Sequence, residues 1–217
     1  MIGGFNLKLI DQVYKKIAGW FGDIKYYHYP LFLVYDPTDY YVTAKDYEEF
    51  VKNLEKGDIV LRTYDHYLDG FVIPGFYSHA ALYIGDGVLV HSCGHTGVAK
   101  ISPFDFAKCD GLAIVRPLLG YDAINKACKY VLEQIGKEYD YWFNFNNENT
   151  YCCTELIYWA YKDTLNVQPI MIKKFFGLAK QEVISPDDYL TAEKCKLIWE
   201  SSYCRNNRKN INKLSEK

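Results

Sequence analysis

The sequence predicts an α+β fold in which the sheet is mostly antiparallel. Strand-like apolar runs are gathered in the middle of the chain, and helical patterns lie at both ends of it. Residues 78–92 read as two strands joined by a tight turn, which is typical of an antiparallel hairpin. A doubly wound α/β fold would instead require strands and helices to alternate. The 217 residues suffice for one domain with its own core.

The N-terminal part is predicted to pack on that domain. Apolar side chains recur at helical spacing over residues 5–21, which predicts an amphipathic helix docked on the core. A helix on a membrane surface is the alternative, but its polar face is only weakly basic. Residues 22–42 are aromatic and are interrupted by Pro30 and Pro37, so we expect irregular structure there. Thr43 and the acidic residues after it predict the start of the next helix.

The middle of the chain is predicted to form the sheet. A strand is expected over residues 59–63, and residues 64–77 form a loop rich in Tyr, Gly and Asp. Loops of this length in compact domains tend to be lids or binding loops. The hairpin follows with Gly85-Asp86-Gly87 as its turn, and residues 111–118 are expected to add another strand.

The C-terminal part is predicted to be mainly helical. Residues 121–135 form an amphipathic helix that Gly136 stops, and an aromatic loop over residues 139–145 leads into a helix over residues 151–160. From Cys204 onwards basic residues are frequent and apolar ones are few, so we expect a frayed, solvated end.

Composition excludes several classes of function. A formal charge of −2 argues against a nucleic-acid binder that works by neutralising phosphates. Seven cysteines, an odd number without a CxxC motif, favour reduced thiols and a cytoplasmic location over a disulfide scaffold. The first residues lack the features of a secretion signal, and no window approaches the roughly 20 apolar residues of a membrane span.

Cys153 is a candidate nucleophile because a helix start favours a thiolate. It lies where an Asn-rich loop gives way to an apolar helix, so helix-end amides should stabilise its anion. The positions three, four and seven residues after Cys153 are all apolar, whereas those after Cys152 include Glu155. Periodicity therefore prefers Cys153 over Cys152, but only modestly.

The register of the hairpin decides whether His79 and His91 can act together. A two-residue turn would pair Leu82 with His91 and put the two histidines on opposite faces. A three-residue turn with a left-handed Gly87 would pair Ala81 with His91, so that the histidines become diagonal neighbours on one face. In the second register His79 could take the proton of the Cys153 thiol, and His91 could orient the ring of His79.

Three sequence blocks resemble the motifs of a known family. They are Leu54 to Val60, Ser78 to Gly85, and Tyr151 to Leu156. Together with weaker blocks at Gly136 to Asp140 and Ser185 to Asp188, they are similar to the motif series of the YiiX/YaeF-like permuted papain-fold amidases, a branch of the NlpC/P60 superfamily. The similarity runs from about residue 54 to residue 196.

The resemblance implies a circularly permuted papain-like fold, with the sheet packed against the helix that carries the nucleophilic cysteine. The family's nucleophile precedes a Ser/Thr-Glu-Leu sequence, which implies Cys153. The basic histidine carries over to His79, and the third polar group, on the next strand, carries over to His91. The branch often has Glu at this third position, whereas the wider superfamily often has His.

The implied function is a thiol-dependent amidase or peptidase with a Cys-His-His acyl-enzyme mechanism and no cofactor. Its substrate would be a small amide, a peptide or an acyl ester. A lipid acyl hydrolase or acyltransferase is the enzymatic alternative, because the aromatic loop would suit an apolar substrate, and an inactive binding module is the other. The implied organisation is an extension over residues 1–50, a catalytic domain over residues 51–200 and a basic, flexible tail over residues 201–217.

Other residues have weaker arguments. Asp58 either touches substrate or bonds local backbone, and Tyr77 and Tyr151 either line the pocket or belong to the core. Soft ligands alternate between His91 and His95, a pattern that would suit a structural zinc site, but the sequence shows no fourth ligand. We therefore expect no metal.

Overall fold

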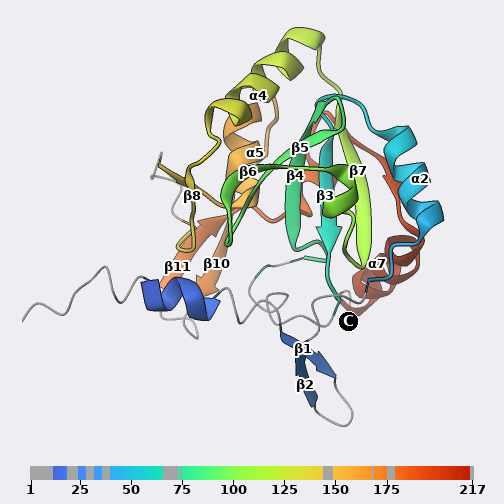
Figure 1. Cartoon of the computed structure of the whole chain (residues 1–217), viewed down its shortest axis with the longest axis vertical. Coiled ribbons are helices and arrows are strands. Elements are labelled where there is room, and N and C mark those ends of the chain that lie inside the picture. Colours follow the sequence, from blue (N-terminus) through green and yellow to red (C-terminus); the bar gives the residue numbers. More distant parts are fainter. Residues whose placement is uncertain are drawn as a thin grey trace, which may run out of the picture.

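A twisted six-stranded sheet forms the centre of the molecule (Figure 1). The structure is a computed structural model that describes residues 12–18, 24–27, 32–35, 40–65, 73, 75–143, 149–167, 169–174 and 179–215. The strand order is β12-β7-β3-β4-β5-β6, and every neighbouring pair is antiparallel. The predicted α+β fold is therefore confirmed. The strands are β3 (Ile59–Thr63), β4 (His79–Gly85), β5 (Val88–Cys93), β6 (Gly97–Ile101), β7 (Gly111–Pro117) and β12 (Cys195–Glu200).

Helices cover both faces of this sheet (Figure 1). Helices α4 (Tyr121–Glu133) and α5 (Cys153–Tyr161) pack on one face, against buried residues such as Leu61 and Leu82. Helices α2 (Ala44–Asn53) and α3 (Pro103–Phe106) cover the other face, against residues such as Val60 and Ala81. Because side chains alternate along a strand, consecutive apolar residues supply two separate cores.

The smaller elements surround this centre. Strands β1 (Ile24–Tyr27) and β2 (Phe32–Tyr35) form an antiparallel pair, as do β10 (Ile170–Lys174) and β11 (Ala179–Val183), whereas β8 (Glu138–Tyr139) and β9 (Thr150–Tyr151) pair in parallel. Helices α6 (Asp188–Thr191) and α7 (Ser202–Ser215) complete the described chain. The irregular structure expected over residues 22–42 is thus partly wrong, because their aromatic and β-branched residues form two strands and Pro30 falls between them.

Most of the other predicted elements are present. The expected strand over residues 59–63 is β3, and the helix expected after Thr43 is α2, which Thr43 caps together with Asp46. The helix expected over residues 5–21 is seen over 12–18, and the remainder of that range lies outside the described residues. Most of the predicted loop over residues 64–77 also lies outside them.

The hairpin has the register that pairs Ala81 with His91. A bulge produces this register, rather than the three-residue turn that the sequence suggested. Asp86 and Gly87 form a two-residue turn with φ of 51° and 69°, and Gly85 pairs with Val88. A bulge before Gly85 then shifts the register by one residue. The bulge puts both histidines on one face of the sheet although the turn is a tight one.

The expectation of a frayed, solvated C-terminal end is wrong from Cys204 onwards. Residues Ser202–Ser215 form helix α7, and Cys204 is fully buried. Arg208 forms an ion pair with the buried Glu200, with Nε 2.7 Å from Oε1. The composition of this segment is misleading, because a segment with few apolar residues can still form a helix that buries one face.

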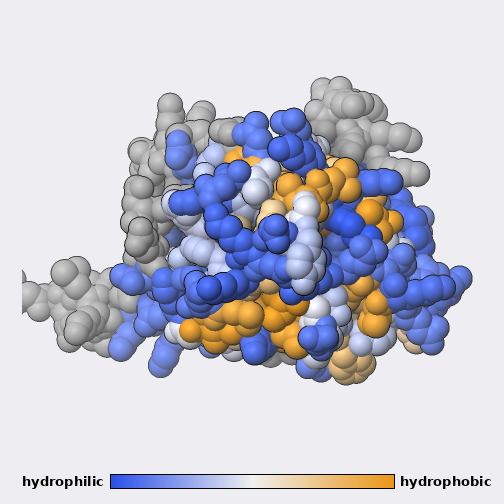
Figure 2. Space-filling view, turned by 90° about the horizontal axis from the view of Figure 1, so that it is seen from above, coloured by the Kyte–Doolittle hydropathy of each residue, from blue (hydrophilic) through white to orange (hydrophobic). Residues whose placement is uncertain are grey.

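All seven cysteines are free thiols. Among the described residues no helix is long and apolar enough to cross a membrane. On the face seen in Figure 2, hydrophilic residues dominate and apolar side chains lie in separate patches.

Candidate active site

A capping box fixes the start of helix α5 at Cys153. The N-cap residue is Cys152, whose backbone N–H donates to Glu155 Oε2 at 2.8 Å. The backbone N–H of Glu155 donates in turn to the Cys152 sulfur. This reciprocal pattern satisfies donors at the helix end. The Cys152 thiol is therefore used in the cap, while the Cys153 thiol is turned towards the sheet.

The sulfur of Cys153 is buried and accepts two backbone hydrogen bonds. The donors are the N–H of Ala80 on β4 and the N–H of Thr154 in the first turn of α5. Burial raises the pKa of the Cys153 thiol to about 11, and the two donors and the charge of Arg62 oppose this shift only in part. The group is therefore a thiol at neutral pH, and it needs a base to become a nucleophile.

The Ala80 N–H places this sulfur at the end of the β4–β5 ladder. Amides along a strand point alternately to its two neighbours. The Tyr83 N–H points to β3, where it donates to the carbonyl of Asp58, so the Ala80 N–H points to the β5 side. The recorded β4–β5 pairing stops at Ala81 and His91. The sulfur thus lies where the two strands separate, next to the backbone of His79.

His79 and His91 form a hydrogen-bonded pair on the face of the sheet that carries Ala81 and packs against Phe106. His79 Nε2 lies 2.9 Å from His91 Nδ1, and the ring planes are at 87° to each other. Burial lowers the pKa of His79 well below 6.5, with smaller contributions from Arg62 and His91. Burial, followed by the charge of Arg62, lowers the pKa of His91 to about 4. Both imidazoles are therefore neutral at neutral pH.

The other ring nitrogen of His79 is available for the thiol. Because Nε2 is held by His91, Nδ1 is the nitrogen that can accept a proton from Cys153, provided that Nε2 carries the hydrogen that His91 accepts. The structure records no direct hydrogen bond between the Cys153 sulfur and the His79 ring, both of which it describes. Catalytic hydrogen bonds are often long in unliganded sites and tighten when substrate binds.

Arg62 and Phe106 lie beside the two histidines, and neither was predicted to be a site residue. Arg62 lies directly opposite His79 in the β3–β4 pairing. The ring of Phe106 lies 5.8 Å from that of His79 and 6.2 Å from that of His91, measured between centroids. A signal for Arg62 was present, because it is the one charged residue in the apolar strand Ile59–Thr63.

The three weaker candidates do not join this group. Tyr77 is buried in the core and its hydroxyl donates to Glu200 Oε1 at 2.7 Å. The hydroxyl of Tyr151 contacts Tyr130 on α4, at 3.0 Å between oxygens. Both side chains therefore belong to the packed interior rather than to a substrate pocket.

Asp58 is held by a structural ion pair. Its two carboxylate oxygens each lie 2.8 Å from Arg116, one from Nε and the other from Nη2. The second oxygen also accepts the Glu55 N–H at 2.7 Å. This geometry argues against substrate binding by Asp58 and favours the local bonding that was its alternative.

Replacing Asp58 by Asn is therefore expected to lower the free energy of unfolding by about 3 kcal/mol, because it removes the buried carboxylate and leaves the half-buried guanidinium of Arg116 only the exposed Glu55. Glu55→Gln removes the other carboxylate on Arg116, which is exposed, and should cost less than about 1 kcal/mol. Urea denaturation of both variants measures the difference. Equal losses would contradict the structural role of Asp58.

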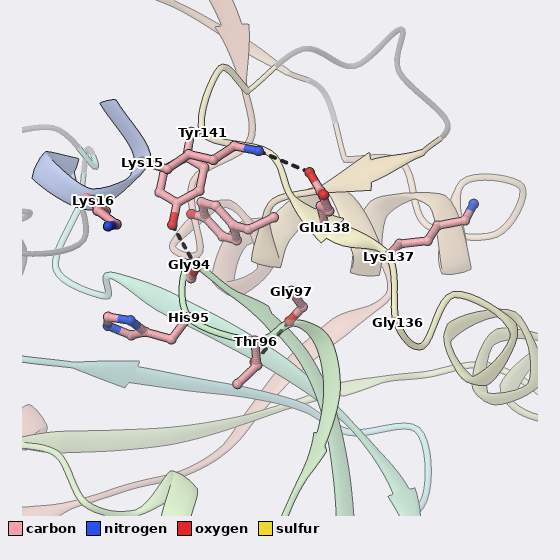
Figure 3. Close-up of a pocket in the computed structure, with 11 residues that line it drawn as sticks. Lys15, Lys16, Gly94, His95, Thr96, Gly97, Gly136, Lys137, Glu138 and Tyr141 are labelled. Atoms are coloured by element: carbon pink, nitrogen blue, oxygen red, sulfur yellow. Dashed lines mark hydrogen bonds and ion pairs between the residues drawn. The ribbon is translucent and has the colours of Figure 1, made fainter. Parts of the chain in front are cut away.

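A cavity of about 660 Å³ lies between the 12–18 helix, the β5–β6 turn and the chain around β8 (Figure 3). Lys15 crosses it to reach Glu138 at 3.0 Å, and the Tyr141 hydroxyl donates to the carbonyl of Gly94 at 2.6 Å. Tyr139 lies near both the cavity and Cys153. It lines the cavity, and burial raises the pKa of Tyr139 well above its usual value, with the nearby Cys153 contributing.

Within the described ranges, no group of three or more His, Cys, Asp or Glu side chains is arranged to hold a metal ion. Cys93 lies in the middle of the soft-ligand pattern between His91 and His95. Its sulfur lies 3.2 Å from Thr96 Oγ1.

The antiparallel sheet and the helix that starts with a cysteine beside two sheet histidines define a papain-like protein in which the cysteine block follows the histidine block. Residues 53–207 match the family model described as permuted papain-like amidase enzyme, YaeF/YiiX, C92 family. The match covers more than half of the chain, which therefore belongs to this family.

A solved structure supports the same fold. It is the crystal structure of yiiX from Escherichia coli O157:H7, a protein that its description calls a metalloprotein. The TM-score is 0.58 at 15% sequence identity, over 69% of this chain and 98% of the other. At this identity the likeness supports the fold alone. A search of curated proteins finds no match to the chain.

Proposed function

We propose that this chain is a thiol-dependent amidase or peptidase in which Cys153 is the nucleophile, His79 its base and His91 the group that orients His79. The observation that supports this proposal is that the Cys153 sulfur accepts a hydrogen bond from the backbone amide of Ala80, the residue after His79, while His79 Nε2 is hydrogen bonded to His91. Membership of an amidase family supports the reaction class.

The first chemical step transfers the thiol proton to His79 Nδ1 as the sulfur bonds to the amide carbon. Because both imidazoles start neutral, the ring can accept this proton, and His91 accepts the Nε2 hydrogen bond that stabilises the resulting imidazolium. Backbone amides at the start of α5 are placed to stabilise negative charge that develops beside the sulfur.

The second half of the reaction releases both products. His79 returns the proton to the amide nitrogen, the C–N bond breaks and an acyl-enzyme remains on Cys153. Water then loses a proton to His79 and attacks the acyl carbon, which frees the thiol. We assign the cavity that Tyr139 borders to part of the substrate, because Tyr139 also lies close enough to Cys153 for that thiol to contribute to its raised pKa.

Alkylation by iodoacetamide tests this proposal without a known substrate. At pH 8 we expect Cys153 to react faster than the more exposed Cys93 and Cys195, because in the proposed mechanism His79 accepts the proton of Cys153 during the reaction. Mass spectrometry of the peptides gives each rate. Equal, slow labelling of all seven thiols would refute the proposed chemistry.

A further inference from the structure

Arg62 is a half-buried cation placed directly beside the proposed catalytic residues. It occupies the position opposite His79 on the neighbouring strand, so the two side chains share one face of the sheet. Its guanidinium carbon lies 4.5 Å from the ring centroid of Phe106, which also contacts both histidine rings. The charge of Arg62 is close enough to lower the pKa of Cys153, His79 and His91.

The guanidinium of Arg62 has no carboxylate partner among the residues that the structure describes. Nη1 donates to the Phe106 carbonyl at 3.4 Å, a long hydrogen bond, and the buried Nε has no hydrogen-bond partner. The rings of Phe106 and Tyr64 supply cation–π contacts at 4.5 and 5.1 Å. These contacts hold the side chain in place, but they leave its charge and most of its donors uncompensated.

Two other half-buried arginines in the same chain show the contrast. Arg116 is bound by Asp58 with two hydrogen bonds, and Arg208 is bound by Glu200 in the same two-pronged manner. A partly desolvated guanidinium is normally paired with such a carboxylate, because its fork of donors fits two carboxylate oxygens. Arg62 departs from this pattern beside the two histidines of the proposed site.

We propose that Arg62 binds a carboxylate of the substrate next to the bond that Cys153 attacks. The substrates would then be amides that carry a free carboxylate close to the scissile carbonyl, such as acidic peptides or amides of amino acids. This inference rests on the proposed function, and it adds the class of substrate. The carboxylate of the substrate takes the place of the missing protein carboxylate on the guanidinium.

Iodoacetate and iodoacetamide provide a matched pair of probes. Both place the same CH₂I group at the sulfur, which displaces iodide while its proton leaves, and they differ only in that one carries a carboxylate. The reaction is run on the full chain at pH 8, above 6.5, so that both histidines stay neutral in every variant. The measured quantity is the ratio of the iodoacetate rate to the iodoacetamide rate at Cys153, with urea-unfolded protein as the reference.

We expect this ratio to be at least about tenfold higher in the folded protein than in the unfolded protein, because a hydrogen-bonded guanidinium and carboxylate attract strongly. Arg62→Met should remove that preference, and Arg62→Lys should keep part of it. Lys108→Met is the matched control, since it deletes another cation stacked on a phenylalanine ring, and it should keep the wild-type ratio.

The outcomes separate the two proposals. Fast labelling of Cys153 by iodoacetamide with the same ratio in folded and unfolded protein would overturn the role of Arg62 and leave the proposed function standing. A preference that survives in Arg62→Met would overturn it as well. Slow labelling of Cys153 by both reagents would remove the proposed function, and this inference with it. The comparison of folded and unfolded wild type needs no variant, so it holds even if Arg62→Met does not fold.

Discussion

Cys153→Ala is expected to lower amide hydrolysis by at least about a thousandfold, because it removes the thiol that we propose forms the acyl-enzyme. The assay is turnover of the amide and ester substrates that a screen of the wild-type protein identifies. Cys152→Ala is the matched control. It deletes the neighbouring thiol, whose role in the structure is to cap helix α5, and should cost about 1 kcal/mol of stability while most activity remains.

The opposite result would change which of the two cysteines at the start of α5 is the nucleophile. If Cys152→Ala were inactive and Cys153→Ala active, the nucleophile would be the capping residue and the geometry at Ala80 would be irrelevant to catalysis. Loss of activity in both variants with intact thermal unfolding would show that the start of α5 must be unchanged for turnover, and would leave the two thiols unresolved as nucleophiles.

His79→Ala should have the second largest effect, a loss of about 10²- to 10⁴-fold in kcat/KM, which is the usual contribution of a general base. His91→Ala should slow turnover less, because His91 acts through His79, to which it is hydrogen bonded. Steady-state rates of the two variants at pH 8 measure the difference. An unchanged rate in His91→Ala would remove His91 from the site.

The pH profile gives a second readout for His79. Only the neutral ring accepts a proton, so activity is lost as the pH falls through the pKa of His79, which burial holds well below 6.5. Wild-type kcat/KM should therefore stay high down to about pH 6.5 and decline only at lower pH. His79→Ala should lack this decline in whatever activity remains. A wild-type midpoint above 7 would contradict the buried, neutral pair.

Much of the site could be predicted from the sequence because it depends on local order. The apolar run of β3 and the helix start at α5 are determined by neighbouring residues. The family blocks added the choice between Cys152 and Cys153, which periodicity left open. Asp58, Tyr77 and Tyr151 were less predictable, since nothing local distinguishes a pocket residue from a core residue.

The sequence by itself determined the class of fold, the four sheet strands β3, β4, β5 and β7, and which side chains carry reactive groups, because alternation and turn signals act over a few residues. It did not indicate β6 and β12, which complete the sheet. Only the tertiary structure decided that a bulge sets the hairpin register, that the last basic segment is a helix with a buried cysteine, and that Arg62 lies beside His79 without a carboxylate from the described part of the chain. Each of these depends on contacts between residues far apart in the chain, where burial and pairing outweigh local preference.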